Sequence, residues 1–298
     1  MDFFAAQELA KKRTRISIAL FVLAVLATII AVYFAFWGIL ILMAHYGFAF
    51  DPASEGVFSL ALWSPQRAAW VGGITAIFIL ISSLMRLSEI SSGGIKVVEL
   101  LGGRFLDPRA SDEKEKRLLN VVEEMAIASG YAIPQVAILD NEMGINAFAA
   151  AFSPRDAVIV VTKGALESFN REELQGVIGH EFSHLLNGDS KLNLTLHGWV
   201  HGLLALSTLG YGILRSFGRS RGSSRRSKGG GGAIILAIIL FAVALIIIGS
   251  IGHLVGLIIQ ALISRQREYL ADASAIQFTR NPEAFVRALG RIQKTGSL

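Results

Sequence analysis

His180-Glu181-Phe182-Ser183-His184 is the most informative stretch of this 298-residue sequence. It lies within 171–187, a segment for which Asn170 is a suitable N-cap and Glu173, three residues further on, can complete a capping box. Gly188, which follows this segment, is a typical helix stop. We therefore predict one helix that carries the whole stretch.

The two histidines of this stretch are four residues apart, so on a helix their imidazoles point to the same side. His180 and His184 could then bind one zinc ion, with Glu181 beside them to hold a water molecule. This is the His-Glu-x-x-His arrangement of metallopeptidases. A chance occurrence of the pattern and a buried structural pair of histidines are the two alternatives.

A catalytic zinc site of this kind needs a third protein ligand. Downstream, Glu268 and Asp272 lie one helical turn apart. We expect Glu268 to be that ligand, and Asp272 to accept the free N–H of a ligating imidazole and so fix its tautomer. Taken alone, the same residues also fit an ordinary amphipathic helix with solvated carboxylates.

With these motifs the sequence resembles a known family, the HtpX-type membrane zinc metalloproteases, relatives of the CAAX prenyl endoproteases. Its hydrophobic spans also have counterparts in that family. The resemblance rests on three motifs in the family's order: Gly144-Ile145-Asn146-Ala147-Phe148-Ala149, then Gly179-His180-Glu181-Phe182-Ser183-His184 with Asn187-Gly188-Asp189, then Ser264-Arg265 through Asp272.

The resemblance implies an α+β fold, in which a multi-pass α-helical membrane protein carries a cytosolic zincin-like (His-Glu-x-x-His) metalloprotease domain with a small β-sheet. One zinc ion (Zn2+) per chain would be held by His180, His184 and Glu268, with Glu181 as the catalytic base. The implied role is quality control of misfolded or damaged membrane proteins. Polypeptide substrates and the lipid bilayer are the implied partners, while the natural substrates, the cleavage preference and any oligomeric partner stay open.

The composition independently indicates a membrane protein. Apolar residues make up 53% of the chain, charged residues 17%, and the mean hydropathy is +0.54. The absence of cysteine excludes disulfides and thiolate metal sites, so a zinc site must use histidine and carboxylate. The net charge of +5 comes from local basic clusters without interleaved aromatic residues, so no nucleic-acid partner is expected.

Residues 1–90 are expected to form an amphipathic segment, 1–15, and two transmembrane helices. Segments 16–44 and 68–85 contain no charged residue and are long enough to span a hydrocarbon core of about 30 Å. Four basic residues precede the first span, and only Arg67 lies in the connection after it. This asymmetry predicts that the N-terminus and the catalytic domain are cytosolic. The expected location is the cell inner (cytoplasmic) membrane, with several passes through it.

Residues 91–191 are expected to form the first part of the metalloprotease domain. Ser111 is the predicted cap of a helix over 112–129. Three strands should follow, at 135–139, 146–152 and 157–162, the last two joined as a hairpin by Ser153-Pro154-Arg155-Asp156.

Within that hairpin, a peptide substrate could add to the sheet edge through main-chain hydrogen bonds. The candidate residues for this edge are Asn146, Ala147, Phe148 and Ala149. A plain core strand is the alternative.

Residues 192–263 should form an inserted hairpin of two transmembrane helices, and 264–298 the second part of the metalloprotease domain, with a last helix from Asn281-Pro282. The basic, Gly/Ser-rich loop 218–232 would lie outside if the hairpin spans, against the positive-inside tendency. A re-entrant hairpin is therefore the alternative, although segment length favours spanning. Whether the natural chain continues past Leu298 is left open.

His197 and His201 are four residues apart on the first helix of this hairpin. Ionisable groups at membrane depth are functional candidates, so these two could polarise the substrate carbonyl or stabilise the oxyanion. Hydrogen-bonded packing between helices is the alternative.

Two other functions compete with proteolysis by zinc. A non-enzymatic membrane scaffold or transport component with a structural metal would fill all four zinc positions with protein, whereas the motifs supply three ligands. Prenyl-protein processing would need a chamber within a larger set of membrane helices than the four spans expected here. The sequence therefore favours a zinc-dependent membrane endopeptidase.

Overall fold

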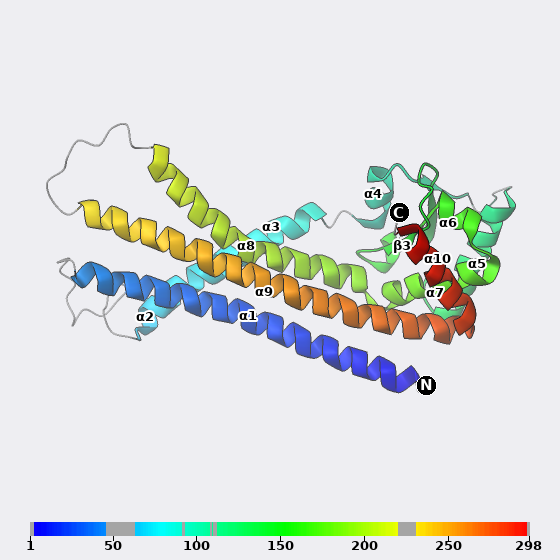
Figure 1. Cartoon of the computed structure of the whole chain (residues 1–298), viewed down its shortest axis with the longest axis horizontal. Coiled ribbons are helices and arrows are strands. Elements are labelled where there is room, and N and C mark those ends of the chain that lie inside the picture. Colours follow the sequence, from blue (N-terminus) through cyan, green and yellow to red (C-terminus); the bar gives the residue numbers. More distant parts are fainter. Residues whose placement is uncertain are drawn as a thin grey trace. The chain divides into compact units, whose positions relative to one another are not determined.

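The computed structural model describes residues 3–45, 63–90, 93–107, 109, 112–219 and 231–296 (Figure 1). This part of the chain is mostly helical and contains one small sheet. Residue contacts divide the chain into two compact units. The first unit comprises Met1–Ile16, Ser88–Thr195 and Leu262–Leu298, and the second comprises Ser17–Leu87 and Leu196–Ala261.

The elements follow one another with the labels of Figure 1. The helices are α1 (Phe3–His45), α2 (Pro65–Arg67), α3 (Gly73–Ile90), α4 (Gly93–Leu100), α5 (Glu113–Ser129), α6 (Lys163–Ser168), α7 (Arg171–Asn187), α8 (Asp189–Arg219), α9 (Gly231–Thr279) and α10 (Pro282–Gly296). A π-helical turn, Ala68–Gly72, joins α2 to α3. The strands are β1 (Arg104–Phe105), β2 (Gln135–Leu139), β3 (Ala147–Ala150) and β4 (Val158–Thr162).

The sheet of the first unit has the order β1-β2-β4-β3, which leaves β3 at an edge. β2 and β4 are parallel, and the other two pairs are antiparallel. The three strands expected from the sequence are thus confirmed as β2, β3 and β4. The predicted turn between the last two contains the short helix Pro154–Asp156, closed by a capping box between Ser153 and Asp156.

Both faces of the sheet are covered, which is why β4 is the uninterrupted β-branched run Val-Ile-Val-Val-Thr and is buried at every position. One face packs on α5 and α7 through side chains that include Leu118, Val122, Ile159, Ile178 and Phe182. Val98 of α4 covers Ala137, Val158 and Val160 on the other face. β3 is thereby held between α4 on one face and the core that includes α7 on the other.

The predicted helix at 112–129 is confirmed as α5, but its predicted cap, Ser111, is wrong. The cap is Asp112, whose Oδ1 accepts the amides of Lys114 at 2.8 Å and Glu115 at 3.0 Å. A carboxylate at this position reaches both free amides and also favours the positive end of the helix dipole. Ser111 itself lies outside the described residues.

Three helices of the described chain are long and apolar enough to cross a membrane: Lys11–His45, Pro65–Glu89 and Ile234–Thr279. They correspond to three of the four spans expected from the sequence. The fourth, α8, is not among them, because polar residues such as Asn193, His197 and Ser207 interrupt its apolar surface. Most of the expected basic loop, 220–230, lies outside the described residues.

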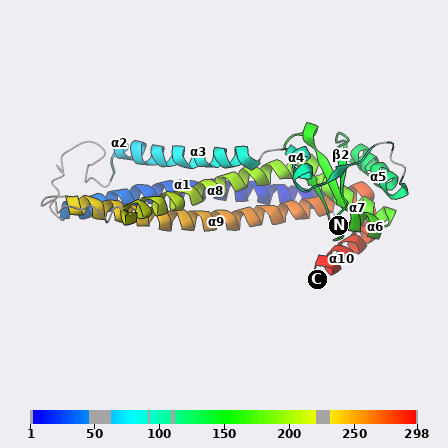
Figure 2. The ribbon, with the colours of Figure 1, turned by 90° about the horizontal axis from the view of Figure 1, so that it is seen from above.

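Two of the long helices cross boundaries that the sequence suggested. The amphipathic start and the first span are one continuous helix, α1, without a break near Arg15. α9 likewise continues unbroken from its apolar half through the Glu268 motif (Figure 2).

In the second unit, α8 lies beside α9 and close to α3 through small residues (Figures 1 and 2). A Cβ at Gly249 of α9 would lie 2.6 Å from the backbone N of Ser207, and one at Gly202 would lie 2.7 Å from the carbonyl oxygen of Ile79. Ser207 Oγ also donates to the Ile246 carbonyl at 3.0 Å. Close backbone approach supported by such hydrogen bonds is typical of helices packed in membranes.

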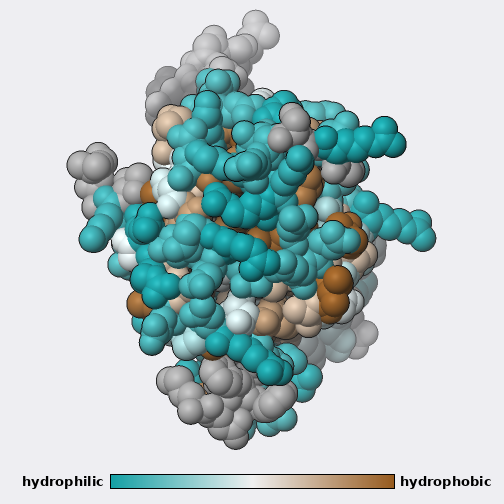
Figure 3. Space-filling model, turned by 90° about the vertical axis from the view of Figure 1, so that its right-hand side faces the viewer, coloured by the Kyte–Doolittle hydropathy of each residue, from teal (hydrophilic) through white to brown (hydrophobic). Residues whose placement is uncertain are grey.

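The first unit has the surface of an ordinary folded domain. Figure 3 views the end of the structure that carries α5 and α6, and this face is mostly hydrophilic with small separate hydrophobic patches.

The last helix, α10, begins as expected, because Asn281 Oδ1 accepts the amide of Ala284 at 3.1 Å.

Candidate active site

The helix predicted around the His-Glu-x-x-His stretch is confirmed as α7, with both of its predicted end signals. Asn170 Oδ1 accepts the amide of Glu173 at 2.9 Å, and Glu173 Oε2 accepts the amide of Asn170 at 3.1 Å. Gly188 ends the helix with a φ of 66°, in the left-handed region that glycine adopts without strain. The start and the end of the helix are thus set by local sequence alone.

Two glycines let α7 pack closely on its neighbours. A Cβ at Gly176 would lie 3.2 Å from the Cα of Phe285 in α10, and one at Gly179 would lie 3.4 Å from the sulfur of Met125 in α5. The ring of Phe285 stacks on His180, with centroids 5.8 Å apart. The turn that carries the histidines is therefore fixed on both sides.

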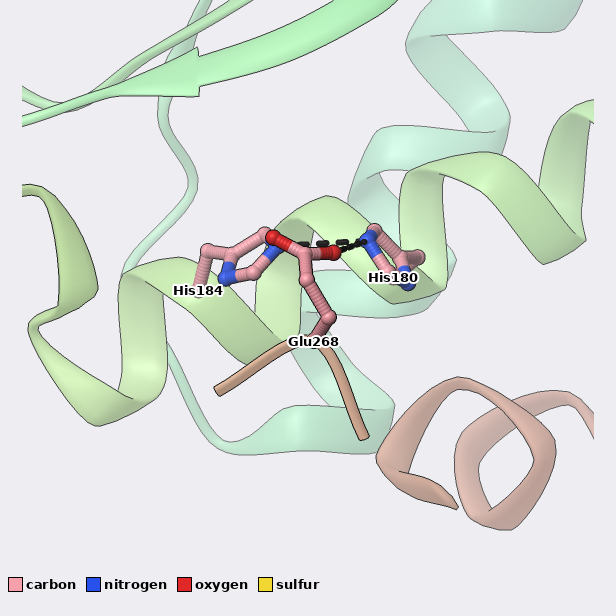
Figure 4. Close-up of side chains that lie close together, drawn as sticks. All are labelled: His180, His184 and Glu268. Atoms are coloured by element: carbon pink, nitrogen blue, oxygen red, sulfur yellow. Dashed lines mark hydrogen bonds and ion pairs between the residues drawn. The ribbon is translucent and has the colours of Figure 1, made fainter. Parts of the chain in front are cut away.

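Figure 4 shows His180 and His184 projecting from α7 towards Glu268, which extends from α9. His180 Nε2 lies 3.1 Å from His184 Nε2 and 3.4 Å from Glu268 Oε2. His184 Nε2 lies 3.8 Å from the same carboxylate oxygen. The fold thus brings together the three predicted ligands, although 83 residues, 185–267, separate His184 from Glu268 in the sequence.

The donor set fits a zinc ion. Two imidazole nitrogens and one carboxylate oxygen, all within 4.8 Å of one another, are the ligand types that zinc takes from a protein without cysteine. Tetrahedral ligands at zinc distances are about 3.3 Å apart, and the observed separations of 3.1, 3.4 and 3.8 Å bracket this value. Within the described residues, this group contributes three ligands, which leaves one position for water or substrate.

Each imidazole has a carboxylate at its other nitrogen. His180 Nδ1 lies 3.1 Å from Asp272 Oδ1, and His184 Nδ1 lies 2.7 Å from Asp189 Oδ2. A carboxylate at Nδ1 orients the ring and leaves Nε2 free to bind a metal. Asp272 therefore lies where the sequence analysis expected it.

Asp189 and its partner Arg267 are site residues to which the sequence analysis gave no role. Asp189 is 3% exposed and forms an ion pair with Arg267, which is 8% exposed. Arg267 also donates to the carbonyl of Asn187 at 3.0 Å, so it ties the end of α7 to α9. In the sequence, the sign of a role for Asp189 was an acidic residue directly after the Gly188 helix stop.

Glu181 is only 8% exposed and points towards the edge strand, where its Oε2 accepts the amide of Ala149 at 2.8 Å. Burial raises the pKa of Glu181, and the neighbouring His180 and His184 partly oppose that rise. A buried carboxylate whose pKa is raised holds a proton more readily than one in water. This is the property that a general base beside a metal requires.

In the metal-free protein, His180 favours its charged form. Burial lowers the pKa of this imidazole, but the carboxylates of Asp272 and Glu268 outweigh burial and raise the pKa to about 10. A cation at Nε2 would occupy the same electrostatic position as that proton. The arrangement is therefore suited to binding a positive charge.

The four predicted substrate-strand residues lie on or next to the edge strand. Asn146 precedes β3, and Ala147, Phe148 and Ala149 are in it. The amide of Ala149 donates to Glu181 and therefore points away from β4. Backbone groups alternate in direction along an antiparallel strand, so the amide and carbonyl of Ala147, two residues earlier, also point away from β4. His197 and His201 belong to the second unit, and their suggested role stays a prediction.

Comparisons with known proteins support the resemblance seen in the sequence. The Protease HtpX homolog of Dictyoglomus turgidum is 40% identical over 182 residues, which cover 61% of this chain and 55% of that protein. The homolog of Streptococcus pyogenes serotype M5 is 39% identical over 186 residues, 62% of this chain and 60% of that protein. The chain thus matches a little over half of these relatives' length. The model of peptidase family M48 matches residues 112–295, and the chain belongs to that family.

Proposed function

We propose that this protein is an integral-membrane, zinc-dependent endopeptidase with a zincin-like site. The observation that carries the proposal is the cluster of His180, His184 and Glu268, with the buried carboxylate of Glu181 on the same turn of α7. A structural zinc site would be closed by a fourth protein ligand. The three-membered group among the described residues favours catalysis over a scaffold or transport role.

Zinc bound by these three residues would supply a Lewis acid that polarises a peptide carbonyl and acidifies a water molecule. Glu181 then takes a proton from the attacking water and passes it to the nitrogen of the leaving amine. The amide of Ala149 holds Oε2 of Glu181 at 2.8 Å and so fixes the carboxylate before the substrate arrives. Asp189 and Asp272 hold the imidazoles in one tautomer.

We further propose that the substrate binds as an extended strand along the free edge of β3. Among the strands that the structure describes, β3 pairs with β4 on one side only, and the register Ala149–Ile159 leaves alternate backbone groups without a partner among them. A peptide paired with this edge would lie next to Glu181, because Ala149 of the same strand donates its amide to the Glu181 carboxylate.

Metal removal tests the enzymatic proposal. The detergent-solubilised protein should cleave an unfolded substrate such as casein, lose this activity to a zinc chelator, and regain it when zinc is added back. Activity that survives complete loss of the metal would contradict the proposal.

The resemblance also motivates a location and a role: the inner membrane, with the N-terminus and the catalytic parts, 91–191 and 264–298, in the cytosol, and quality control of misfolded or damaged membrane proteins. The 298-residue sequence contains no cysteine, so single introduced cysteines can report topology. Ser224→Cys, in the loop outside the described residues, should react with an impermeant reagent added to intact cells. Ala128→Cys, exposed on α5, should react only after the cells are opened.

The two cysteines separate the possible topologies. Protection of both in intact cells would support a re-entrant hairpin with a cytosolic catalytic unit. Reaction of Ala128→Cys in intact cells would place the catalytic unit on the opposite side of the membrane and overturn the proposed location.

A further inference from the structure

A cavity of about 240 Å³ lies beside the edge strand, within the first unit. Three elements form its wall: the start of α4, the end of β3 with the residues after it, and the start of α8. Its lining includes Gly94, Val97, Ala149, Ala150, Asn193 and Leu194.

The cavity is next to the proposed catalytic base. Ala149 lines it and also donates its amide to Glu181 Oε2 at 2.8 Å. Side chains of an extended peptide alternate between two sides at a rise of about 3.3 Å per residue. A peptide along β3 would therefore place a side chain at this cavity within about one residue of the bond that Glu181 serves.

The wall of the cavity is mostly apolar. Val97, Ala150 and Leu194 contribute hydrocarbon, and a Cβ at Gly94 would lie 2.4 Å from the carbonyl oxygen of Ala150, so α4 is in close contact with the strand. An apolar cavity of about 150 Å³ accommodates a benzene molecule. The cavity here accordingly has room for a side chain such as leucine or phenylalanine.

One polar atom at this cavity lacks a partner. Asn193 Oδ1 is buried, and among the residues that the structure describes it accepts no hydrogen bond. A buried carbonyl oxygen without a donor is costly, so a ligand that brings an N–H group would be favoured there. The backbone amide of a bound peptide is such a donor.

We propose that this cavity is a side-chain subsite that selects a medium-sized apolar residue next to the cleaved bond, with Asn193 accepting a backbone N–H of the substrate. The proposal rests on the proposed peptidase function. It predicts that the enzyme cleaves within apolar segments of polypeptides.

Mapping of cleavage sites tests the subsite. Casein is digested by the solubilised protein, and the products are identified by mass spectrometry. Wild type should favour leucine, phenylalanine or methionine over glycine at one position beside the cut, by about tenfold or more. Val97→Phe should shift that position towards glycine and alanine, and Val97→Ala should relax it towards larger residues. Ala128→Leu, exposed on α5, is the matched control and should keep the wild-type pattern.

Asn193 is tested separately, because it acts on the peptide backbone. Asn193→Leu should lower kcat/KM by about 3–10-fold for all peptides without changing the side-chain preference, whereas Asn193→Asp retains an acceptor and should lose less. Zinc content and melting temperature show whether each variant is folded.

The outcomes distinguish the two proposals. Cleavage by wild type without preference at any position, or a wild-type pattern in folded Val97→Phe, would overturn the subsite and leave the peptidase standing. Absence of any cleavage by zinc-loaded wild type would overturn the peptidase function and the subsite with it.

Discussion

Asp189→Asn should weaken zinc binding and destabilise the fold, because Asp189 is buried between His184 and Arg267. In wild type, Asp189 Oδ2 lies 2.7 Å from His184 Nδ1. The substitution keeps the size of the side chain and one oxygen that can face this nitrogen, but it removes the negative charge. Arg267, 8% exposed, would then be a buried cation without its counter-charge. Breaking one partner of such a pair costs about 3–5 kcal/mol.

That cost corresponds to a fall in Tm of about 10 °C, at about 2–4 °C per kcal/mol for a domain of this size. Loss of a carboxylate that orients a ligating histidine typically weakens metal binding by about 10–100-fold. Thermal unfolding in a chelator measures the first effect, and zinc competition with a chromophoric chelator measures the second.

The matched control is Asp140→Asn, which removes a carboxylate from an exposed ion pair in the same unit. Asp140 lies 2.9 Å from Arg104, and both side chains are nearly half exposed. Such a pair contributes about 0–1 kcal/mol, so this variant should melt close to wild type and bind zinc normally. If Asp189→Asn behaves like Asp140→Asn in both assays, the assigned role of Asp189 is refuted.

Two further predictions concern the ligands. Glu268→Ala should lower zinc affinity by more than about 100-fold, since a direct ligand contributes more than a supporting residue, and an unchanged affinity would remove Glu268 from the site. Zinc affinity should also rise by about tenfold per pH unit from about pH 7 to about pH 9, because zinc must displace the proton of His180, whose pKa is raised to about 10. The charged form of His180 stabilises the metal-free fold fully below its unfolded pKa of about 6.5, and this contribution is lost as pH rises through about 10. The Tm in chelator should fall over that range, and a flat profile in either measurement would contradict the assigned ion pairs.

Local sequence was sufficient to predict the elements that carry the site. The Asn170 cap, the Gly188 stop and the four-residue histidine spacing all act within one helix, and α7 has the expected form. β2 and β4 were predictable because their β-branched residues form short runs bounded by turn residues, whereas β3 is Ala-Phe-Ala-Ala and was indicated by the turn residues that follow it. Glu268 and Asp272 could be suggested because a site with two histidines needs a third ligand and these two residues lie one helical turn apart, although the spacing alone also fits an ordinary amphipathic helix.

Contacts between distant segments could not be derived in this way. Arg267 meets Asp189 across 78 positions of sequence, and nothing in either local pattern indicates that pairing. The predicted cap of α5 was Ser111 and the observed cap is Asp112, because both adjacent residue types are suitable caps and local sequence does not choose between them. The unbroken course of α1 and α9 reflects the absence of helix breakers where composition changes from polar to apolar.

The most direct test of the central proposal is the zinc content and casein cleavage of purified wild type measured beside Glu181→Gln. The substitution removes the proposed base but none of the three proposed ligands. Both proteins should bind about one zinc per chain, and only wild type should cut casein. Equal cleavage by both proteins, or loss of zinc from Glu181→Gln, would contradict the role of Glu181 as the base beside a metal held by His180, His184 and Glu268.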